Sequence, residues 1–288
     1  LFAAEGRLLE AYGHDVDRFT IPADAADGYR SLGLARAMIW NKSVEGQLRE
    51  RVRRHQPEIV HFHNTFPLVS PGAYYAARES GAAVVQTLTD YRLLCANGRL
   101  YRNNAVCETC VGRKVGTPAI RHKCYRDSRI ASAGAVGMVA LHNRMGTWAS
   151  AVDMYIVPSA FARSKFLRFG LPGTKVMVKP HFVEKDPGKG SHQGGFALWV
   201  GPLMEEQGFR TVHDAWERIG RWLPLKVVGE GPLESLSRQH VQGIEWLGRR
   251  SVAEVTDLMK DALFLVSAPN TLETFSMSII QGYATGLP

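Results

Sequence analysis

The 288-residue sequence contains no long hydrophobic run and no low-complexity tract. Its longest apolar runs, at 196–200 and 262–266, suit buried strands and are far shorter than the roughly 20 residues that cross a bilayer. Charged residues recur through positions 1–12, so we expect no secretory signal and a cytoplasmic protein. No G-x-G-x-x-G motif follows a predicted strand, which argues against a nicotinamide dehydrogenase.

Cysteine is scarce, and acidic residues are scarce where the cysteines lie. All 4 cysteines fall between Tyr91 and Ile130, a stretch in which Glu108 and Asp127 are the only acids. Nine cations accompany them, so this stretch nets +7 of the chain's formal charge of +8. The sequence therefore predicts a basic, cysteine-rich module inserted in a near-neutral protein. The nine cations are Arg92, Arg99, Arg102, Arg113, Lys114, Arg121, Lys123, Arg126 and Arg129.

The rest of the chain alternates between amphipathic helical patterns and short apolar strands. Before a Gly- and Pro-rich linker at 184–195, the pattern predicts strands at 15–21, 58–63, 83–88, 154–158 and 175–179 and helices at 2–12, 34–54, 73–79, 131–150 and 160–169. After the linker, it predicts strands at 196–200, 225–228, 244–247 and 264–267 and helices at 211–219, 233–240, 252–259 and 277–284.

This alternation predicts an α/β fold with two Rossmann-like, doubly wound parallel-sheet domains facing a cleft. We place the first domain at 1–183, with the cysteine-rich insertion at about 91–130, and the second at 196–288. We expect the first strand of the first domain to be missing and the second domain to be truncated. Ligands of such sheets bind beyond the carboxyl ends of the strands.

Several motifs occur in an order and spacing typical of one enzyme family. The second half contains VGPLMEEQG at 200–208, VVGEGPL at 227–233 and ETFSMSIIQ at 273–281. The first half contains HFHN at 61–64, LTDYRLLC at 88–95 and PSAFAR at 158–163. Together they resemble the family 4 glycosyltransferases, which have the GT-B fold and retain anomeric configuration.

The resemblance implies transfer of a hexose from a nucleotide-diphosphate sugar to a saccharide or lipid-linked acceptor. It also implies polysaccharide or glycolipid synthesis, a place at the inner membrane face and no catalytic metal. The basic module is expected to attract anionic lipid headgroups or phosphate, although a solvated charged loop explains it nearly as well.

The donor half must stabilise charge that builds on the leaving diphosphate. Gly201 and Gly208 let the backbone approach phosphate, and a helix that starts near Gly208 points its positive end there. Glu273, before the last helix, is the candidate for binding sugar hydroxyls and for catalysis, although it could be only a helix-terminal charge. Gln281 lies eight residues further on, about 12 Å away if all of them are helical, and is assigned to the ribose. Glu230 lies in the second motif.

Several positions depart from the family pattern. The family has Arg where this chain has Pro202, and Lys where this chain has Gln207. Gln207 is still a candidate donor-binding residue. The second Glu of the family's E-x7-E motif corresponds to Gln281 in this chain. Each lost phosphate contact is worth roughly 1.5–3 kcal/mol. Arg249, Arg250 and Lys179 are the candidate replacements.

The acceptor half carries a second group of candidates. A family His near the reacting sugar corresponds to Thr89, and the next residue, Asp90, is either a catalytic base or a loop cap. His61 and His63 share one strand face, where burial of both is possible. His63, Asn64 and Arg92 are the candidates on the acceptor side.

The cysteines follow the pattern C-x11-C-x2-C-x13-C at Cys95, Cys107, Cys110 and Cys124. This pattern favours a closed structural zinc site with four thiolate ligands, with His122 as a substitute ligand. A short basic loop has few apolar residues, so the metal would supply its stability. Free thiols or disulfides are the alternative, and a cytosolic setting disfavours disulfides.

Two other functions remain open from the sequence. Substitutions at Thr89, Pro202, Gln207 and Gln281 suit a weakened or inactive homologue that only binds a sugar nucleotide or an acceptor. Nucleic-acid binding through the basic module would use its tyrosines for stacking. Because the rest of the chain is near neutral, we expect no nucleic-acid partner.

Overall fold

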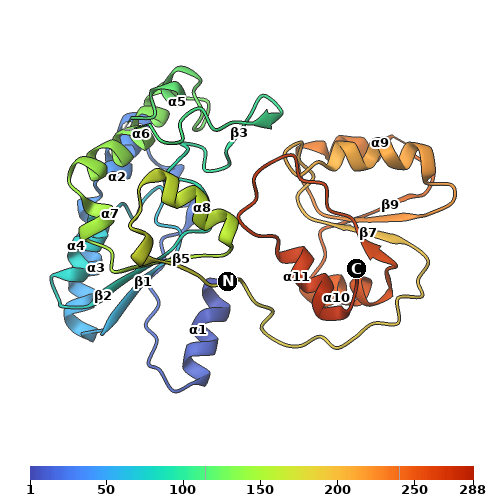
Figure 1. The fold of residues 1–288 in the computed structure, drawn as a ribbon, viewed down its shortest axis with the longest axis horizontal. Coiled ribbons are helices and arrows are strands. Elements are labelled where there is room, and N and C mark those ends of the chain that lie inside the picture. Colours follow the sequence, from blue (N-terminus) through green and yellow to red (C-terminus); the bar gives the residue numbers. More distant parts are fainter. Residues whose placement is uncertain (114, 240) are drawn as a thin grey trace. The chain divides into compact units, whose positions relative to one another are not determined.

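A computed structural model describes residues 1–113, 115–239 and 241–288. The chain has a mixed α/β fold with two parallel sheets and divides into two compact units (Figure 1). Unit 1 comprises Leu1–Leu100 and Cys107–Pro180, and unit 2 comprises Tyr101–Val106 and His181–Pro288. The short antiparallel hairpin of β3 (Tyr101–Arg102) and β4 (Ala105–Val106) is thus grouped with the second unit, although it lies within the cysteine-rich stretch.

The sheet of unit 1 has the strand order β1-β2-β5-β6, and every pair is parallel. Because parallel neighbours need crossover connections, helices separate these strands along the chain. The strands are β1 (Ile59–Phe62), β2 (Ala83–Thr87), β5 (Met154–Val157) and β6 (Val176–Val178). The helices are α1 (Phe2–Ala11), α2 (Ser31–Ile39), α3 (Lys42–His55), α4 (Gly72–Arg78), α5 (Thr117–Arg121), α6 (Arg129–Arg144), α7 (Thr147–Ser150) and α8 (Ala160–Phe169), with 3₁₀ turns at Ala23–Ala26 and Gly173–Lys175.

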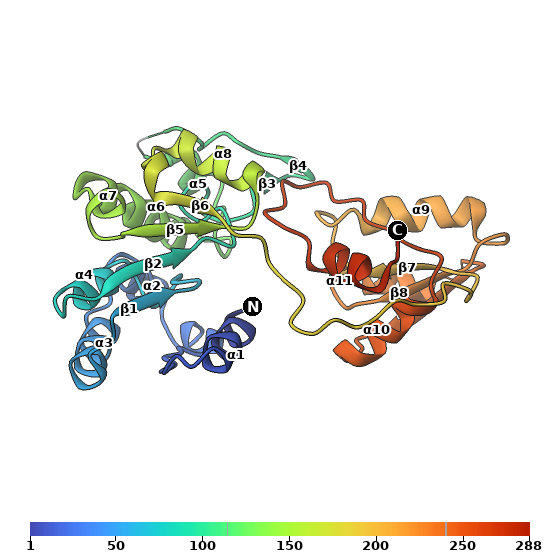
Figure 2. The ribbon, with the colours of Figure 1, turned by 60° about the horizontal axis from the view of Figure 1, so that its bottom comes forward.

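The sheet of unit 2 has the order β10-β7-β8-β9, again all parallel (Figure 2). Its central strands β7 and β8 are largely buried, as expected for a parallel sheet covered on both faces. The strands are β7 (Ala197–Val200), β8 (Leu225–Val228), β9 (Ile244–Gly248) and β10 (Phe264–Leu265). The helices are α9 (Phe209–Ile219), α10 (Val252–Asp261) and α11 (Met277–Thr285), with the 3₁₀ segment η3 (Pro232–Arg238).

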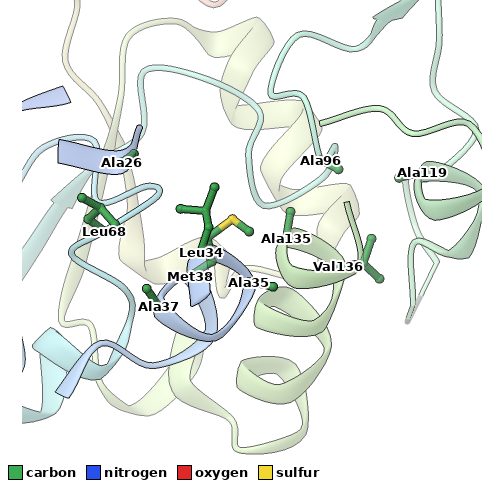
Figure 3. Packing of buried hydrophobic residues seen from close by; sticks show 10 residues of the cluster. All are labelled: Ala26, Leu34, Ala35, Ala37, Met38, Leu68, Ala96, Ala119, Ala135 and Val136. Atoms are coloured by element: carbon green, nitrogen blue, oxygen red, sulfur yellow. The ribbon is translucent and has the colours of Figure 1, made fainter. Parts of the chain in front are cut away.

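Helices α2 and α6 pack closely in the core of unit 1 (Figure 3). Leu34, Ala35 and Met38 of α2 lie against Ala135 and the rest of α6. At Gly134 an added Cβ would lie 2.6 Å from the Cα of Ala35, so only glycine permits this separation of the helices. The small residues of the predicted helix 131–150 therefore serve helix packing.

Two predicted helices are each divided in the structure. The pattern at 34–54 forms α2 and α3, because Trp40 is extended and Asn41 caps α3 by accepting a hydrogen bond from the backbone N–H of Val44 at 3.3 Å. The pattern at 131–150 forms α6 and α7, because Gly146 adopts φ +68° between them. Both apolar periodicities continue through the breaks, so periodicity did not reveal them.

Three other predicted elements differ from the structure. No strand forms at 15–21, where no described strand pairs with this segment. The helix predicted at 233–240 is the 3₁₀ segment η3, which follows Gly231 and begins at Pro232, and His240 lies outside the described residues. The strand predicted at 264–267 pairs over only Phe264 and Leu265.

Candidate functional site

In unit 2, four loops meet at the carboxyl edge of the parallel sheet. Backbone bonds tie them together: the N–H of Gly201 donates to the C=O of Val228 at 3.0 Å, and the N–H of Gly229 donates to the C=O of Gly248 at 3.1 Å. The N–H of Leu203 donates to the C=O of Glu230 at 3.0 Å. The first and second glycine-containing motifs of the sequence are therefore one assembly.

Gly208 lies where backbone crowds backbone. Its φ is +75°, and an added Cβ would lie 1.7 Å from the carbonyl oxygen of Ala268. Gly208 also precedes α9, whose first-turn N–H groups and positive dipole end favour an anion. A substituted side chain would push apart the two loops that reach this helix end. Glycine is therefore required here by the approach of another loop, whereas the sequence analysis expected the approach of phosphate.

Two of the predicted donor residues contact each other. Gln207, directly before Gly208, donates a hydrogen bond to the carboxylate of Glu273. Burial raises the pKa of Glu273 above its ordinary value, and the hydrogen bond from Gln207 opposes part of that shift. A half-buried carboxylate of this kind can accept hydrogen bonds from sugar hydroxyls.

The other predicted donor residues lie on neighbouring segments. Glu273 is in a loop, and α11 begins only after Ser276, so the fully helical spacing assumed between Glu273 and Gln281 is wrong. Gln281 is half-buried on α11. Arg249 is exposed directly after β9, and the neighbouring Arg250 lies 3.9 Å from the carboxylate of Glu254. Pro202 is exposed and supplies no charge.

In unit 1, the loops after β1 and β2 line a cavity. Of the predicted residues, it brings together Asn64, Thr89, Asp90 and Arg92. Lys and Glu are absent from its described lining. The sequence analysis missed the cavity's floor, because its apolar side chains come from helices and look like core residues; they are Met38, Tyr74, Met138 and Trp148.

Asp90 and Arg92 form one side of this cavity. The backbone N–H of Arg92 donates to Oδ1 of Asp90 at 2.9 Å, which is the loop-capping bond considered from the sequence. Its guanidinium lies 3.7 Å from Oδ2 of the same carboxylate. The cap leaves Oδ2 in the cavity wall, so capping and a role in proton transfer are compatible. Thr89 lies beside it.

His63 is not part of the cavity lining and belongs to a different cluster. Its Nε2 lies 3.2 Å from Oε2 of Glu5, and its ring centroid lies 4.2 Å from that of His61. Lys179 donates to Oε1 of Glu5, so it is engaged within unit 1. The sequence analysis missed Glu5, which is a buried acid on an otherwise ordinary amphipathic helix.

Charge and burial shift the titration of this cluster. Burial, and then the charge of His63, lower the pKa of His61 to about 4. For Glu5, burial acts to raise the pKa, but hydrogen bonds from His63 and Lys179 outweigh it and lower the pKa to about 2. In the described part of the chain, Glu5, His61 and His63 are the one group of metal-ligand side chains with ligand atoms within 4.8 Å of one another.

The four cysteines carry thiols and are all half-buried. Cys95 and Cys110 line a second cavity of unit 1 together with Arg113. Burial, and next the charge of Cys95, raise the pKa of Cys110, and Cys107 adds to this shift. In the described residues, no three of the sulfurs lie within 4.8 Å of one another. His122 is exposed at the end of α5.

Comparisons with known proteins bear on both units. Residues 195–288 match the family model described as glycosyl transferases group 1. This match lies within the second unit. An uncharacterized glycosyltransferase of Methanocaldococcus jannaschii is 32% identical over 98 residues, which are 32% of this chain and 27% of that protein. The chain thus spans about a quarter of the curated relative it matches.

Solved structures resemble the chain over both units. HepE of Anabaena in complex with UDP has a TM-score of 0.57 and 15% identity, and the match covers 98% of this chain and 68% of that one. The pneumococcal O-GlcNAc transferase GtfA in complex with UDP and GlcNAc has a TM-score of 0.53 and 15% identity, with coverage of 84% and 43%. The chain therefore shares the fold of GT-B glycosyltransferases. No described helix is long and apolar enough to cross a membrane.

Proposed function

We propose that this protein transfers a hexose from a nucleotide-diphosphate sugar to a saccharide or lipid-linked acceptor with retention, in polysaccharide or glycolipid synthesis. The bond from the anomeric carbon to the diphosphate oxygen breaks, and a bond to an acceptor hydroxyl oxygen forms on the same face. The hydroxyl proton leaves with the nucleoside diphosphate. Family 4 membership and retention rest on the motifs, and the group 1 domain and the GT-B fold support them.

The contact between Gln207 and Glu273 carries this proposal. It places a half-buried carboxylate beside a glycine at a helix N-terminus, so a sugar acceptor and a phosphate cradle are adjacent. The similar HepE structure is in complex with UDP, and the similar GtfA structure is in complex with UDP and GlcNAc, which supports a UDP-sugar donor here. In this assignment, Glu273 binds the sugar and acts in catalysis. The nucleotide and diphosphate are bound by Gly201, Gln207, Gly208, Glu230, Arg249 and Gln281.

On the acceptor side, Asp90 and Thr89 contact the reacting hydroxyl in this proposal. Asn64 and Arg92 bind the rest of the acceptor, because both line the same cavity. His63 is a weaker candidate than the sequence suggests, since Glu5 and the ring of Phe2 hold it outside that lining.

The test is turnover of UDP-, GDP- and ADP-hexoses, measured as released nucleoside diphosphate with and without saccharide acceptors. Replacement Glu273→Gln keeps the shape and removes the charge, and we expect at least a hundredfold loss of kcat/KM, on the order of 3 kcal/mol. Glu217→Gln, on an exposed face of α9, is the matched control and should leave turnover unchanged. Equal activity in both variants would remove Glu273 from the mechanism.

A weakened or inactive homologue that binds a sugar nucleotide or acceptor is the second candidate. Pro202 and Gln207 favour it, because neither brings a cation to the diphosphate. Nucleotide-dependent thermal stabilisation without turnover would support this candidate. Turnover above the uncatalysed rate rules it out.

We propose a structural zinc ion as the cofactor, held by Cys95, Cys107, Cys110 and Cys124. The C-x2-C spacing supports it, as do the shared cavity of Cys95 and Cys110 and the influence of Cys107 on the pKa of Cys110. The ion would draw the sulfurs closer than they lie here, as in domains whose folding requires metal. Purified protein should contain close to one equivalent of zinc, and less than about half an equivalent contradicts a tightly bound ion.

The basic module also supports a cytoplasmic protein that contacts the anionic inner face of the membrane. Its net charge of +7 can gain about 1 kcal/mol per cation near such a surface. Salt-sensitive sedimentation with phosphatidylserine vesicles, and none with phosphatidylcholine vesicles, is the expected result. Equal sedimentation with both contradicts it.

A further inference from the structure

The cavity of unit 1 is lined by charged side chains as well as by polar groups that can bind sugar hydroxyls. In its described lining, Asp90 and Arg92 are the only side chains that carry a formal charge at neutral pH. The remaining lining combines an apolar floor with short polar groups such as Asn64 and Thr89, as in many small-molecule sites. A guanidinium at such a rim determines which ligands can enter.

Aromatic rings hold the guanidinium of Arg92 in place. Its central carbon lies 4.2 Å from the ring centroid of Phe66 and 5.4 Å from that of Tyr125. The two rings meet edge to face, with centroids 5.0 Å apart. Arg92 also donates through Nη1 to the C=O of Ala96. These contacts fix the plane of a side chain that is 19% exposed, so little conformational entropy remains to be lost when a ligand binds.

The hydrogen-bonding capacity of Arg92 is only partly used. Its Nε is buried and has no hydrogen-bond partner among the described residues. The carboxylate of Asp90 lies 3.7 Å from Nη2, too far for a charge-assisted hydrogen bond, and its own side chain is 38% exposed. A buried donor without an acceptor is costly, so Arg92 has unused hydrogen-bonding capacity beside the cavity that it lines.

The formal charges of Asp90 and Arg92 in the cavity lining balance, but the stretch of sequence that Arg92 begins nets +7. Arg113 of the same stretch lines the second cavity together with Arg92. A phosphate offers several oxygens to a planar guanidinium, whereas a hydroxyl offers one. We propose that this cavity binds a phosphate group of the acceptor through Arg92, with Asp90 opposing it. The identification of the ligand as an acceptor rests on the proposed glycosyl transfer.

The first experiment measures binding of inorganic phosphate to the full 288-residue chain by calorimetry. Arg92→Met should lose the phosphate site, with at least a tenfold rise in Kd, and Arg92→Lys should be intermediate. Arg121→Met removes an exposed cation of the same module at the end of α5 and should bind like the wild type. Phosphate bound at the glycine-rich loops of unit 2 is common to all variants and cancels in the comparison.

Asp90→Asn should change phosphate binding in the opposite direction to Arg92→Met, which makes it the decisive variant. Removing the carboxylate that faces Arg92 should tighten phosphate binding roughly tenfold, or about 1.4 kcal/mol. A purely structural role for Arg92 predicts no such gain, and it also predicts that Arg92→Lys and Arg92→Met lower thermal stability without a selective loss of phosphate. Unchanged binding in both Arg92→Met and Asp90→Asn overturns the proposal.

A second experiment identifies the source of the phosphate. Binding to phosphatidylcholine vesicles that contain phosphatidic acid is compared with binding of soluble glycerol phosphate. Dependence on Arg92 with the vesicles alone assigns a lipid phosphate, and dependence with glycerol phosphate alone assigns a soluble one. Absence of sugar-nucleotide turnover by the wild-type chain, with Arg92-dependent phosphate binding intact, would reject the transferase function and leave this site standing as an anion site.

Discussion

The carboxyl edges of the two parallel sheets differ in the groups that they offer. In unit 2, the edge is built from backbone: glycines bring four loops into contact, and Gln207 and Glu273 provide one side-chain pair. In unit 1, the edge is built from side chains, with Arg92 stacked on two rings and Asp90 beside it. The same topology therefore supports two kinds of recognition.

This difference follows from what each ligand would require. A diphosphate common to every sugar nucleotide can be bound by backbone N–H groups, which every substitution except one by proline leaves in place. An acceptor must be told apart from others of similar size, and only side chains vary enough in charge and shape to do so. In a donor site of that kind, the neutral residues Pro202 and Gln207 would be better tolerated in unit 2 than the loss of Arg92 in unit 1.

Gly208→Ala should produce the largest effect, because the new Cβ meets the carbonyl oxygen of Ala268 at 1.7 Å and the residue keeps φ +75°. We expect a loss of at least ~3 kcal/mol in the free energy of unfolding, measured with urea, together with loss of UDP binding. Gly188→Ala is the control: its φ is +74°, but nothing lies within 4 Å, so it should cost only about 1 kcal/mol. Equal losses in the two variants would show that backbone crowding is unimportant at this edge.

Acidification should next destabilise unit 1, through His61. Its folded pKa of about 4 lies below the ordinary 6.5, so the stability that it contributes is present above pH 6.5 and is lost as the pH falls towards 4. Glu5, His63 and Lys179 face it. Between pH 7 and 4.5, we expect urea unfolding to show a loss of ~2 kcal/mol that is smaller in His61→Gln. An identical pH dependence in both proteins contradicts the shift.

Gly98→Ala tests the carboxyl edge of the sheet in unit 1 in the same way as Gly208→Ala tests the carboxyl edge in unit 2. Gly98 has φ +76°, but its nearest neighbours are the far ends of Arg92 and Asp90, at 3.0 and 3.2 Å. These side chains can move, so we expect about 1 kcal/mol of destabilisation and weaker phosphate binding. Loss of stability as large as that of Gly208→Ala would erase the distinction between the two edges.

The smallest effect is expected from the cations of unit 2. Arg249→Ala should weaken UDP binding about threefold to fivefold, since an exposed charge near a phosphate contributes below ~1 kcal/mol. Arg250→Ala should change it less, because Arg250 already lies near Glu254. Calorimetric titration with UDP compares the two. Unchanged binding in the double variant removes both residues from the donor site.

Much of the fold could be predicted from local patterns. The apolar runs predicted seven of the eight strands in the two sheets nearly to the residue, and the eighth, β10, proved shorter. The divided helices could not be predicted, because Asn41 and Gly146 break them through capping and a positive φ that leave the periodicity intact. The strand predicted at 15–21 shows the opposite error: a strand needs a neighbour, and local sequence does not reveal whether one is present.

The candidate site residues could likewise be predicted in part from local patterns, whereas their contacts could not. The spacing of glycines and acids in the three donor motifs, taken with the order of strands, was sufficient to propose Gly208, Glu273 and Gln281 as donor-binding residues. It did not reveal the hydrogen bond from Gln207 to Glu273, nor that His63 lies with Glu5. These contacts join segments that are 58 or more residues apart, so no local pattern contains them.

By itself, the sequence determined the alternation of strands and helices, the basic module with its four cysteines, and the motifs that predict a donor domain. These depend on residue type and short spacing, which local physics translates directly into structure. Only the tertiary structure decided that Arg92 lies over two aromatic rings and lines a cavity together with side chains from α2, α4, α6 and α7. Such a site exists only after packing brings distant side chains together, and its charge and burial depend on that packing.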